Sequence, residues 1–294
     1  MGNCAVNPTP LIQVGDYEFN PNDIIGAGHH GIMFQGSPRK DKLFEIAVKV
    51  INHSFSSRNF DQIQGLLQKL LSVHHENIAH YIDYHYNAKE KKICLIVEFC
   101  AHGSLQDLLN STPTSNHDGD IRKNLQYCHQ IISGLNALHQ KGITHGSLRP
   151  HNILIHYDVL KISDFGLTEL EKLSVEGVRK KYSIFKAPEL FKGAEVITEK
   201  CDIWSLGVIM YQLVYRTRPL EVQAGEYRLF ELHTGKCAEL DDLIAKCLKI
   251  NPEERISPEE LRRHPFISFN PSSIKLMPST PHHNPEHIDL SSAY

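Results

Sequence analysis

The sequence predicts an α+β protein in which a small β-rich half with one main helix precedes a larger, mostly helical half. Residues 17–50 are punctuated by glycine and rich in β-branched side chains, a composition typical of strands and hairpins. From residue 121 onward, apolar residues recur mainly at the spacing of helices. We therefore expect the two halves to meet near residues 98–103.

Two strands and one helix are predicted within the β-rich half. The segment FEIAVKVI (44–51) predicts one strand, and ICLIVEF (93–99) predicts another after the turn-rich NAKEKK (87–92). Between these strands, residues 60–73 carry their apolar side chains on one helical face, which predicts the main helix. The apolar residues of that face are Phe60, Ile63, Leu66, Leu67, Leu70 and Leu71.

The second half begins with HGSLQDLLN (102–110), which predicts a turn followed by a helix, and a polar loop at 111–120. Further helices are expected over 121–139, through 202–214, around 240–250 and around 257–266. Gly134 and Gly207 lie inside helical segments and indicate close packing there.

We expect a folded domain at 17–269, divided into a first lobe at 17–98 and a second at 101–269. Residues 1–16 are expected to form a tail. Residues 270–294 are rich in Pro, Ser and His and are expected to form a disordered tail.

The composition excludes several classes of function. The formal net charge of −3 shows no strong excess of either sign, which argues against nucleic acid as the main partner. The seven cysteines include no CxxC pair, so we expect buried thiols in a reducing compartment. The adjacent histidine pairs at 29–30, 74–75 and 282–283 lack HxxxH spacing, so they do not predict a metal site.

The N-terminus offers two lipid attachment sites. Removal of Met1 from MGNCAV would expose Gly2, a myristoylation acceptor, and Cys4 could then be palmitoylated. Two lipids together can hold a protein on a membrane. Val6 departs from the simple pattern, so an ordinary flexible N-terminus is the alternative. With no run of about 18 apolar residues, we expect a cytoplasmic protein, located at the cytoplasmic face of a membrane if it is lipidated.

A phosphate-binding pattern lies in the β-rich half. The segment IIGAGHHGIM (24–33) contains Gly26, Gly28 and Gly31 as GxGxxG, and the next strand carries Lys49. The same glycine pattern marks dinucleotide folds, but there it leads into a helix, whereas here it lies between strands. A glycine-rich hairpin lets backbone N–H groups approach phosphates, and a neighbouring lysine adds a fixed positive charge.

Seven motifs occur in the order that one known family has: the glycine loop, AVK (47–49), HGSLRPHN (145–152), DFG (164–166), APE (187–189), DIWSLG (202–207) and Arg255 in NPEERIS. Over residues 17–269 the chain thus resembles the eukaryotic protein kinases. Its segment RISPEELRRHPFI resembles their serine/threonine branch. The resemblance implies the bilobal kinase fold, with ATP and Mg²⁺ as cofactors.

The resemblance also implies roles for matching residues. Lys49 would contact the α- and β-phosphates, while Asn152 and Asp164 would hold Mg²⁺ ions. Glu98 and Cys100 would offer backbone groups to adenine. The remaining residues of the implied ATP site are Ile25, Gly26, Ala27, Gly28, Gly31, Met33, Ala47, Arg149 and Leu154.

Three further residues have implied structural roles. Glu189 and Arg255 would form a buried ion pair, and Asp202 would anchor the backbone of the catalytic loop. Because these roles are structural, the three residues predict the fold and not an activity.

The catalytic loop departs from the family at its central residue. His145, Leu148, Pro150 and Asn152 match the family's HRDLKPEN and set the register, so Ser147 stands at the position of the catalytic aspartate. A serine hydroxyl is a poor base, and general-base assistance typically contributes about 10²–10⁴-fold. Residual activity stays open, because phosphoryl transfer rests mostly on positioning and charge stabilisation.

Other positions depart as well. Leu66 stands where the family has the glutamate partner of Lys49, although Asp61 or Gln64 could substitute if the helix shifts. Gly146 replaces an arginine that would pair with a phosphorylated activation segment. Arg149 replaces a lysine with a different donor geometry, and Tyr182 replaces the usual threonine of the peptide-docking segment.

Together these features predict a pseudokinase that binds ATP and signals through its conformation and through contacts with protein partners or a true kinase. One alternative is a weakly active serine/threonine kinase, supported by Arg149, Asn152 and Asp164. The other is a scaffold that binds no nucleotide.

Overall fold

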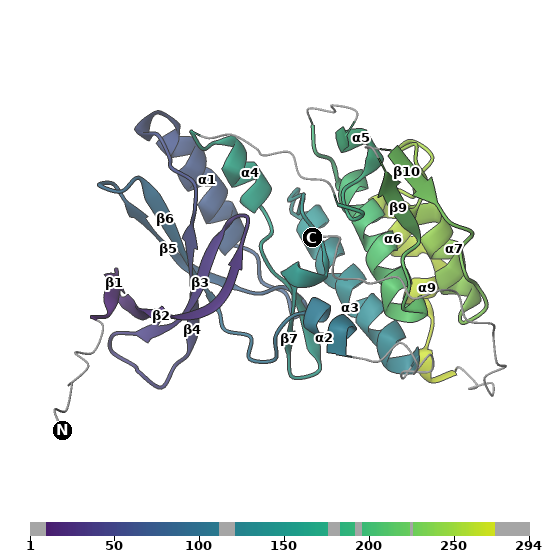
Figure 1. Cartoon of the computed structure of the whole chain (residues 1–294), viewed down its shortest axis with the longest axis horizontal. Helices are drawn as coiled ribbons and strands as arrows, with labels where there is room; N and C mark the ends of the chain where they lie inside the picture. Colours follow the sequence, from purple (N-terminus) through teal and green to yellow (C-terminus); the bar gives the residue numbers. More distant parts are fainter. Residues whose placement is uncertain (1–9, 112–120, 176–182, 192–195, 224–225, 274–294) are drawn as a thin grey trace, which may run out of the picture. The chain divides into compact units, whose positions relative to one another are not determined.

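The structure is a computed structural model that describes residues 10–111, 121–175, 183–191, 196–223 and 226–273 (Figure 1). The chain forms two compact units, one of Met1–Ala101 with Gly166–Val178, the other of His102–Phe165 with Arg179–Tyr294. Several expectations lie outside the described residues: Gly2, Cys4, Tyr182, most of the loop at 111–120, and the tail from 274 onward.

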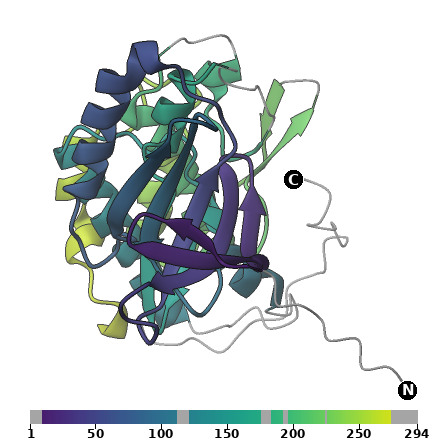
Figure 2. The same ribbon diagram turned by 90° about the vertical axis from the view of Figure 1, so that its left-hand side faces the viewer.

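The first unit is built on a six-stranded antiparallel sheet in the order β1-β2-β3-β4-β6-β5 (Figure 2). The strands are β1 (Ile12–Val14), β2 (Tyr17–Gly28), β3 (Gly31–Pro38), β4 (Ile46–Ile51), β5 (Tyr81–Asn87) and β6 (Lys92–Glu98). Strands β4 and β6 are almost wholly buried, which explains why, apart from Lys49 and the terminal residues Lys92 and Glu98, their side chains are apolar without polar alternation. Both strands predicted from sequence are therefore confirmed.

Helix α1 (Phe60–Leu71) of the first unit follows the 3-10 turn η1 (Ser57–Asn59) and contacts β5. Ile63, Leu67 and Leu70 are its buried residues, so the predicted amphipathic helix is confirmed.

A second, short helix, α4 (Leu167–Lys172), also belongs to this unit, although its sequence lies far beyond residue 101. Gly166 precedes α4 with a φ of +73°, and a Cβ added there would lie 2.5 Å from Leu70 Cδ2. Close contact between Gly166 and α1 thus explains why residues 166–178 group with the first unit, whereas the sequence placed them in the second lobe.

The second unit is mostly helical, so the α+β prediction is confirmed. Its helices are α2 (Leu105–Ser111), α3 (Ile121–Gln140), α5 (Pro188–Phe191), α6 (Glu199–Tyr215), α7 (Ala238–Cys247), α8 (Pro258–Arg263) and α9 (Pro265–Ser268), with 3-10 turns η2 (Pro150–Asn152) and η3 (Pro271–Ser273). Two hairpins complete it, β7 (Ile153–His156) with β8 (Val159–Ile162), and β9 (Leu220–Gln223) with β10 (Glu226–Leu229).

Helix α6 forms the centre of the second unit's core. Every residue from Cys201 to Tyr215 is buried, as expected for a helix that is apolar all round. A Cβ added at Gly207 would lie 2.7 Å from Cys247 Cβ, so this glycine permits the close approach of α7 that its position inside a helical segment predicted. Gly134 of α3 is buried too.

The thiols behave as the composition predicts. The described cysteines are all free, with Cys100 half-buried and the others buried: Cys94, Cys128, Cys201, Cys237 and Cys247. Among the described residues, no helix combines the length and the apolar character needed to cross a membrane.

Candidate functional site

The glycine-rich segment is a two-residue hairpin in the first unit. Gly28 at the end of β2 pairs with Gly31 at the start of β3, which leaves His29 and His30 as the turn. The register of β3 on β4 places Met33 between Gly26 and Lys49. The sheet therefore brings together the glycine and lysine parts of the phosphate-binding pattern.

The three glycines of this hairpin serve different purposes. A Cβ added at Gly31 would lie 2.2 Å from the backbone oxygen of Val50, so packing against β4 requires glycine there. A Cβ at Gly26 would meet only Met33 Cβ at 3.8 Å, and one at Gly28 would meet nothing within 4 Å. The fold therefore does not require glycine at these two exposed positions, which fits a surface that a phosphate group approaches closely.

Lys49 lies in β4 with only 6% of its surface exposed, and Ala47 on the same strand is 4% exposed. Leu66 of α1 is half-buried, as is Gln64, while Asp61 in the first turn of α1 is exposed. The helix therefore packs with leucine at the position where the family has glutamate.

The end of strand β6, which would contact adenine, is held by two hydrogen bonds between Glu98 and His80. The Glu98 N–H donates to the carbonyl of His80 at 2.9 Å, and the Glu98 carboxylate accepts from the His80 N–H at 3.1 Å. The backbone group that Glu98 could offer to adenine is therefore its carbonyl oxygen. Cys100 follows as a half-buried residue at the end of this unit's first segment.

In the second unit, a buried carboxylate holds the catalytic loop. Asp202 of α6 accepts hydrogen bonds of 2.8 Å from the backbone N–H groups of His145 and Gly146, and its Oδ2 lies 2.9 Å from His139 Nε2. The predicted anchoring role of Asp202 is confirmed. Gly146 has a φ of +75°, a backbone region that glycine occupies without the steric cost borne by other residues.

His145 is the second support of the loop. Its Nε2 lies 2.9 Å from the carbonyl oxygen of Ser163, and its Nδ1 accepts the backbone N–H of Ser147 at 3.3 Å. This pattern requires the neutral tautomer with the proton on Nε2. Complete burial lowers the pKa of His145 and outweighs the opposing effect of nearby Asp202, which agrees with a neutral ring.

Two residues would hold a metal ion: Asn152, in the loop that contains Ser147, and Asp164, further along the chain. Asn152 is 6% exposed, and its Nδ2 donates to the backbone oxygen of Ser147 at 2.8 Å. With its nitrogen used in this way, the oxygen of the amide is the atom that could face a cation. Asp164 is half-buried and has a φ of +62°, an uncommon conformation that Asp tolerates better than most residues.

The predicted ion pair between Glu189 and Arg255 is confirmed. Arg255 Nη1 and Nη2 donate to the two carboxylate oxygens of Glu189 at 2.8 and 3.0 Å, and the Arg255 side chain is fully buried. The guanidinium also donates to the carbonyls of Lys249 and Lys200, and it lies 5.3 Å from the ring centroid of Trp204. These contacts satisfy the buried charge.

The predicted ATP-site residues thus divide between the two units. The first unit carries Ile25, Gly26, Ala27, Gly28, Gly31, Met33, Ala47, Lys49, Glu98 and Cys100, and the second carries Ser147, Arg149, Asn152, Leu154 and Asp164. In the first unit, strand register brings Gly26, Met33 and Lys49 together. In the second unit, hydrogen bonds to Asp202 and His145 hold the backbone around Ser147.

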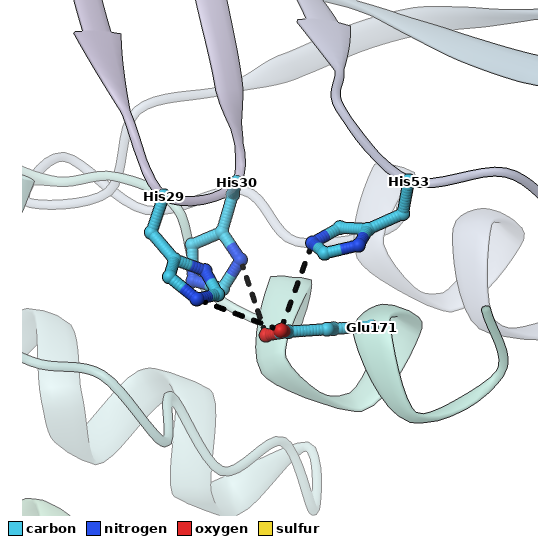
Figure 3. A group of neighbouring side chains, drawn as sticks. All are labelled: His29, His30, His53 and Glu171. Carbon is cyan, nitrogen blue, oxygen red and sulfur yellow. Dashed lines mark ion pairs between the residues drawn. The ribbon is translucent and has the colours of Figure 1, made fainter. Parts of the chain in front are cut away.

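Sequence reasoning missed one polar group in the first unit. His29, His30 and His53 converge on Glu171 of α4 (Figure 3). The pairing of the strands could have revealed part of this group. Gly31 pairs with Ile51, which places residues 29–30 beside residues 52–53. No spacing rule pointed to Glu171.

Comparison with known families decides the assignment. A model of the protein kinase domain matches residues 19–267. The chain belongs to the protein kinase family. Serine/threonine-protein kinase ULK1 from Homo sapiens is 31% identical over 290 residues, covering 90% of this chain and 27% of that protein. Serine/threonine-protein kinase stk11 from Xenopus laevis is 30% identical, covering 88% of this chain and 63% of that protein.

Aurora kinase from Schizosaccharomyces pombe is a third relative within the protein kinase family, 28% identical over 258 residues. The match covers 83% of this chain and 69% of that kinase. The chain spans less than two thirds of the length of ULK1 and stk11. What it shares with those two proteins is therefore one part of each.

Proposed function

We propose that this protein-kinase-family chain is a pseudokinase that binds ATP with Mg²⁺ and signals through its conformation and its contacts with protein partners. The observation that carries the proposal is Ser147, which stands at the position of the catalytic base within a loop whose supporting hydrogen bonds to Asp202 and His145 are intact. The loop therefore keeps its supporting hydrogen bonds, but at position 147 it has a hydroxyl in place of the carboxylate that would act as a base.

Nucleotide binding is supported in the first unit by the glycines and the lysine. Gly26 and Gly28 leave space that no packing requirement explains, and Lys49 supplies a positive charge one strand further along the sheet. Backbone N–H groups of the hairpin would bind phosphate oxygens, and the ammonium group would neutralise part of their charge.

Metal binding is supported in the second unit by an amide oxygen and a carboxylate. Asn152 and Asp164 offer the oxygen donors that Mg²⁺ prefers, and the hydrogen bond from Asn152 to Ser147 orients the amide. Bound Mg²⁺ would neutralise charge on the phosphate oxygens.

Weak catalysis follows from the chemistry of Ser147. A neutral hydroxyl can orient a substrate hydroxyl by a hydrogen bond, but it does not accept the proton near pH 7. Leu66 stands where the family has a glutamate, so the side chain at this position of α1 offers Lys49 no carboxylate. Partner binding then becomes the function that the retained fold can still perform.

The test is a titration of the full-length chain with ATP, with and without Mg²⁺, followed by thermal unfolding and calorimetry. We expect saturable binding that depends on Mg²⁺ and is lost in Lys49→Ala and Asp164→Ala. Absence of binding at millimolar nucleotide would contradict the proposal and favour the scaffold alternative. Asp158→Ala is the control, because Asp158 is an exposed residue of the second unit.

A weakly active serine/threonine kinase is the second candidate, favoured by the retained Arg149, Asn152 and Asp164. A radiolabelled phosphotransfer assay separates it from the first. Activity that disappears in Asp164→Ala and persists in Ser147→Ala would favour the kinase, because such catalysis would depend on metal and positioning without a base. No transfer above that of Asp164→Ala favours the pseudokinase.

A further inference from the structure

A cluster of three histidines and one glutamate, here called the histidine cluster, lies in the first unit, and none of its members has a role in the predicted ATP site. Its members are His29 and His30 in the hairpin turn, His53 after β4, and Glu171 of α4. One ligand atom from each residue lies within 4.8 Å of all the others. Figure 3 shows the three rings directed at the carboxylate, two from the hairpin turn and one from the segment after β4.

The three contacts between histidine and Glu171 are of similar length. His29 Nε2 and His53 Nε2 each lie 3.7 Å from Glu171 Oε1, and His30 Nδ1 lies 3.7 Å from Oε2. None of these contacts is short enough for a hydrogen bond. Neighbouring donors around tetrahedral Zn²⁺ lie about 3.3 Å apart, so each of the three histidine–Glu171 pairs has to close by about 0.4 Å. All four ligand atoms already lie within 4.8 Å of one another.

Burial makes the composition of the cluster significant. The Glu171 side chain is 2% exposed, and those of His30 and His53 are each 8% exposed. A metal ion bound here would add positive charge beside this buried carboxylate. The His29 side chain, 27% exposed, offers a route by which an ion could enter.

Backbone contacts hold the four residues in place independently of any ion. The Asn52 N–H donates to the carbonyl of His30 at 3.1 Å, which ties the hairpin turn to the segment carrying His53. The Val175 N–H donates to the Ser54 carbonyl at 2.9 Å, and Phe55 forms a β-bridge with Ser174. These contacts fix the segment after α4 to the segment after β4, so the donors converge without a large rearrangement.

We propose that His29, His30, His53 and Glu171 form a Zn²⁺ site that joins the glycine-rich turn to helix α4. Three imidazoles and one carboxylate supply four protein ligands, and coordination by four protein ligands is the usual arrangement of a structural zinc site. Imidazole donors favour Zn²⁺ and related transition metals over Mg²⁺ and Ca²⁺, which prefer oxygen. Zinc bound here restrains the turn that follows Gly28 and the helix that follows the DFG motif.

The zinc proposal does not rest on nucleotide binding, so its failure leaves the proposed function untouched. The test uses the full chain, stripped of metal with a chelator and titrated with ZnCl₂ by calorimetry. We expect one Zn²⁺ per chain, a higher melting temperature, and no effect of MgCl₂ on either. Zinc binding in Asp164→Ala should equal that of the original chain, which excludes the predicted Mg²⁺ site as the location.

Matched variants assign the ligands. His53→Gln and Glu171→Gln keep the approximate size of each side chain, and each should weaken zinc binding more than about 100-fold, because loss of an outer-shell partner alone costs about 10–100-fold. His74→Gln is the control, since exposed His74 lies outside the histidine cluster. Equal zinc binding in all three variants would overturn the proposal, as would absence of binding in the original chain.

Two spectroscopic measurements cover variants that fail to fold. Co²⁺ bound to the original chain should show the intense visible bands of tetrahedral coordination, whereas octahedral bands would contradict the site. Zinc should also slow amide hydrogen exchange at residues 29–31 and 168–175. Protection confined to other segments would overturn the assignment.

Discussion

The Oδ1 atom of Asp202 accepts a hydrogen bond of 2.8 Å from the backbone N–H of Gly146, the residue immediately before Ser147. The other carboxylate oxygen accepts the N–H of His145, also at 2.8 Å, and lies 2.9 Å from His139. One buried side chain of α6 thus holds the backbone of the loop that contains Ser147.

The first prediction concerns this carboxylate. Asp202→Asn replaces one acceptor oxygen with an NH₂ group that faces a backbone N–H, so it should lower the free energy of unfolding by about 2–3 kcal/mol. Urea denaturation of the full chain measures the effect. Asp158→Asn, at an exposed surface pair with Lys123, should leave the unfolding midpoint nearly unchanged. Equal midpoints for the two variants would contradict the anchoring role.

The second prediction concerns the missing base. Ser147→Asp should raise the phosphotransfer rate by about 10²-fold or more, because the restored carboxylate can accept the proton of the substrate hydroxyl. Ser147→Asn has nearly the same size and no charge, so it should give no increase. If neither variant changes the rate, the loss at Leu66 limits catalysis, and Leu66→Glu combined with Ser147→Asp should then be the active form.

The third prediction separates the glycines of the hairpin. Gly31→Ala should destabilise the chain by about 1–3 kcal/mol, because its Cβ would lie 2.2 Å from the Val50 carbonyl oxygen. Gly28→Ala should keep the stability within about 0.5 kcal/mol, since nothing lies within 4 Å of its Cβ.

Gly28→Ala should instead raise the Kd for Mg-ATP about tenfold, which corresponds to ~1.4 kcal/mol. Thermal unfolding and nucleotide calorimetry on both variants provide the two measurements. Unchanged ATP affinity in Gly28→Ala would show that phosphates do not approach the hairpin at this residue.

The fourth prediction concerns the pair of Glu189 and Arg255. Arg255→Lys loses the two-pronged contact with the carboxylate and should lower the free energy of unfolding at pH 7 by about 3 kcal/mol. Arg262→Lys is the matched control, because Arg262 pairs with exposed Glu259 at the surface and its loss should have little effect.

The same pair predicts a pH dependence. Burial alone raises the pKa of Glu189, but the hydrogen bonds from Arg255 and the other polar contacts outweigh it, so the pKa lies below its ordinary value of 4.5. A depressed pKa stabilises the folded state fully above pH 4.5, and this contribution is lost as the pH falls through the folded-state pKa. The stability difference between the original chain and Arg255→Lys should therefore shrink below that pH. A constant difference would contradict the prediction.

Much of the candidate site followed from local patterns. The glycine loop, Lys49 on its strand, and the register of the catalytic loop around Ser147 depend on short stretches of sequence with recognisable spacing. The Glu189–Arg255 pair and the anchoring by Asp202 followed from resemblance to a known family. Neither could be derived from periodicity, because each joins residues more than 50 positions apart.

Helix α4 and the histidine cluster could not be predicted in the same way. The apolar residues of α4 cover fewer than two helical turns, too short for a periodic signal. Its membership of the first unit depends on the absence of a side chain at Gly166, beside Leu70. His29 and Glu171 belong to segments that only packing brings together.

The sequence by itself determined the α+β class and the positions of the longer helices and strands, because hydrophobic periodicity is a local property of the chain. Its resemblance to the protein kinases implied that Ser147 stands at the position of their catalytic aspartate. Only the tertiary structure decided which glycines the fold requires and which residues surround Glu171. Those outcomes depend on distances between segments remote in sequence, which close packing of side chains determines and linear spacing does not record.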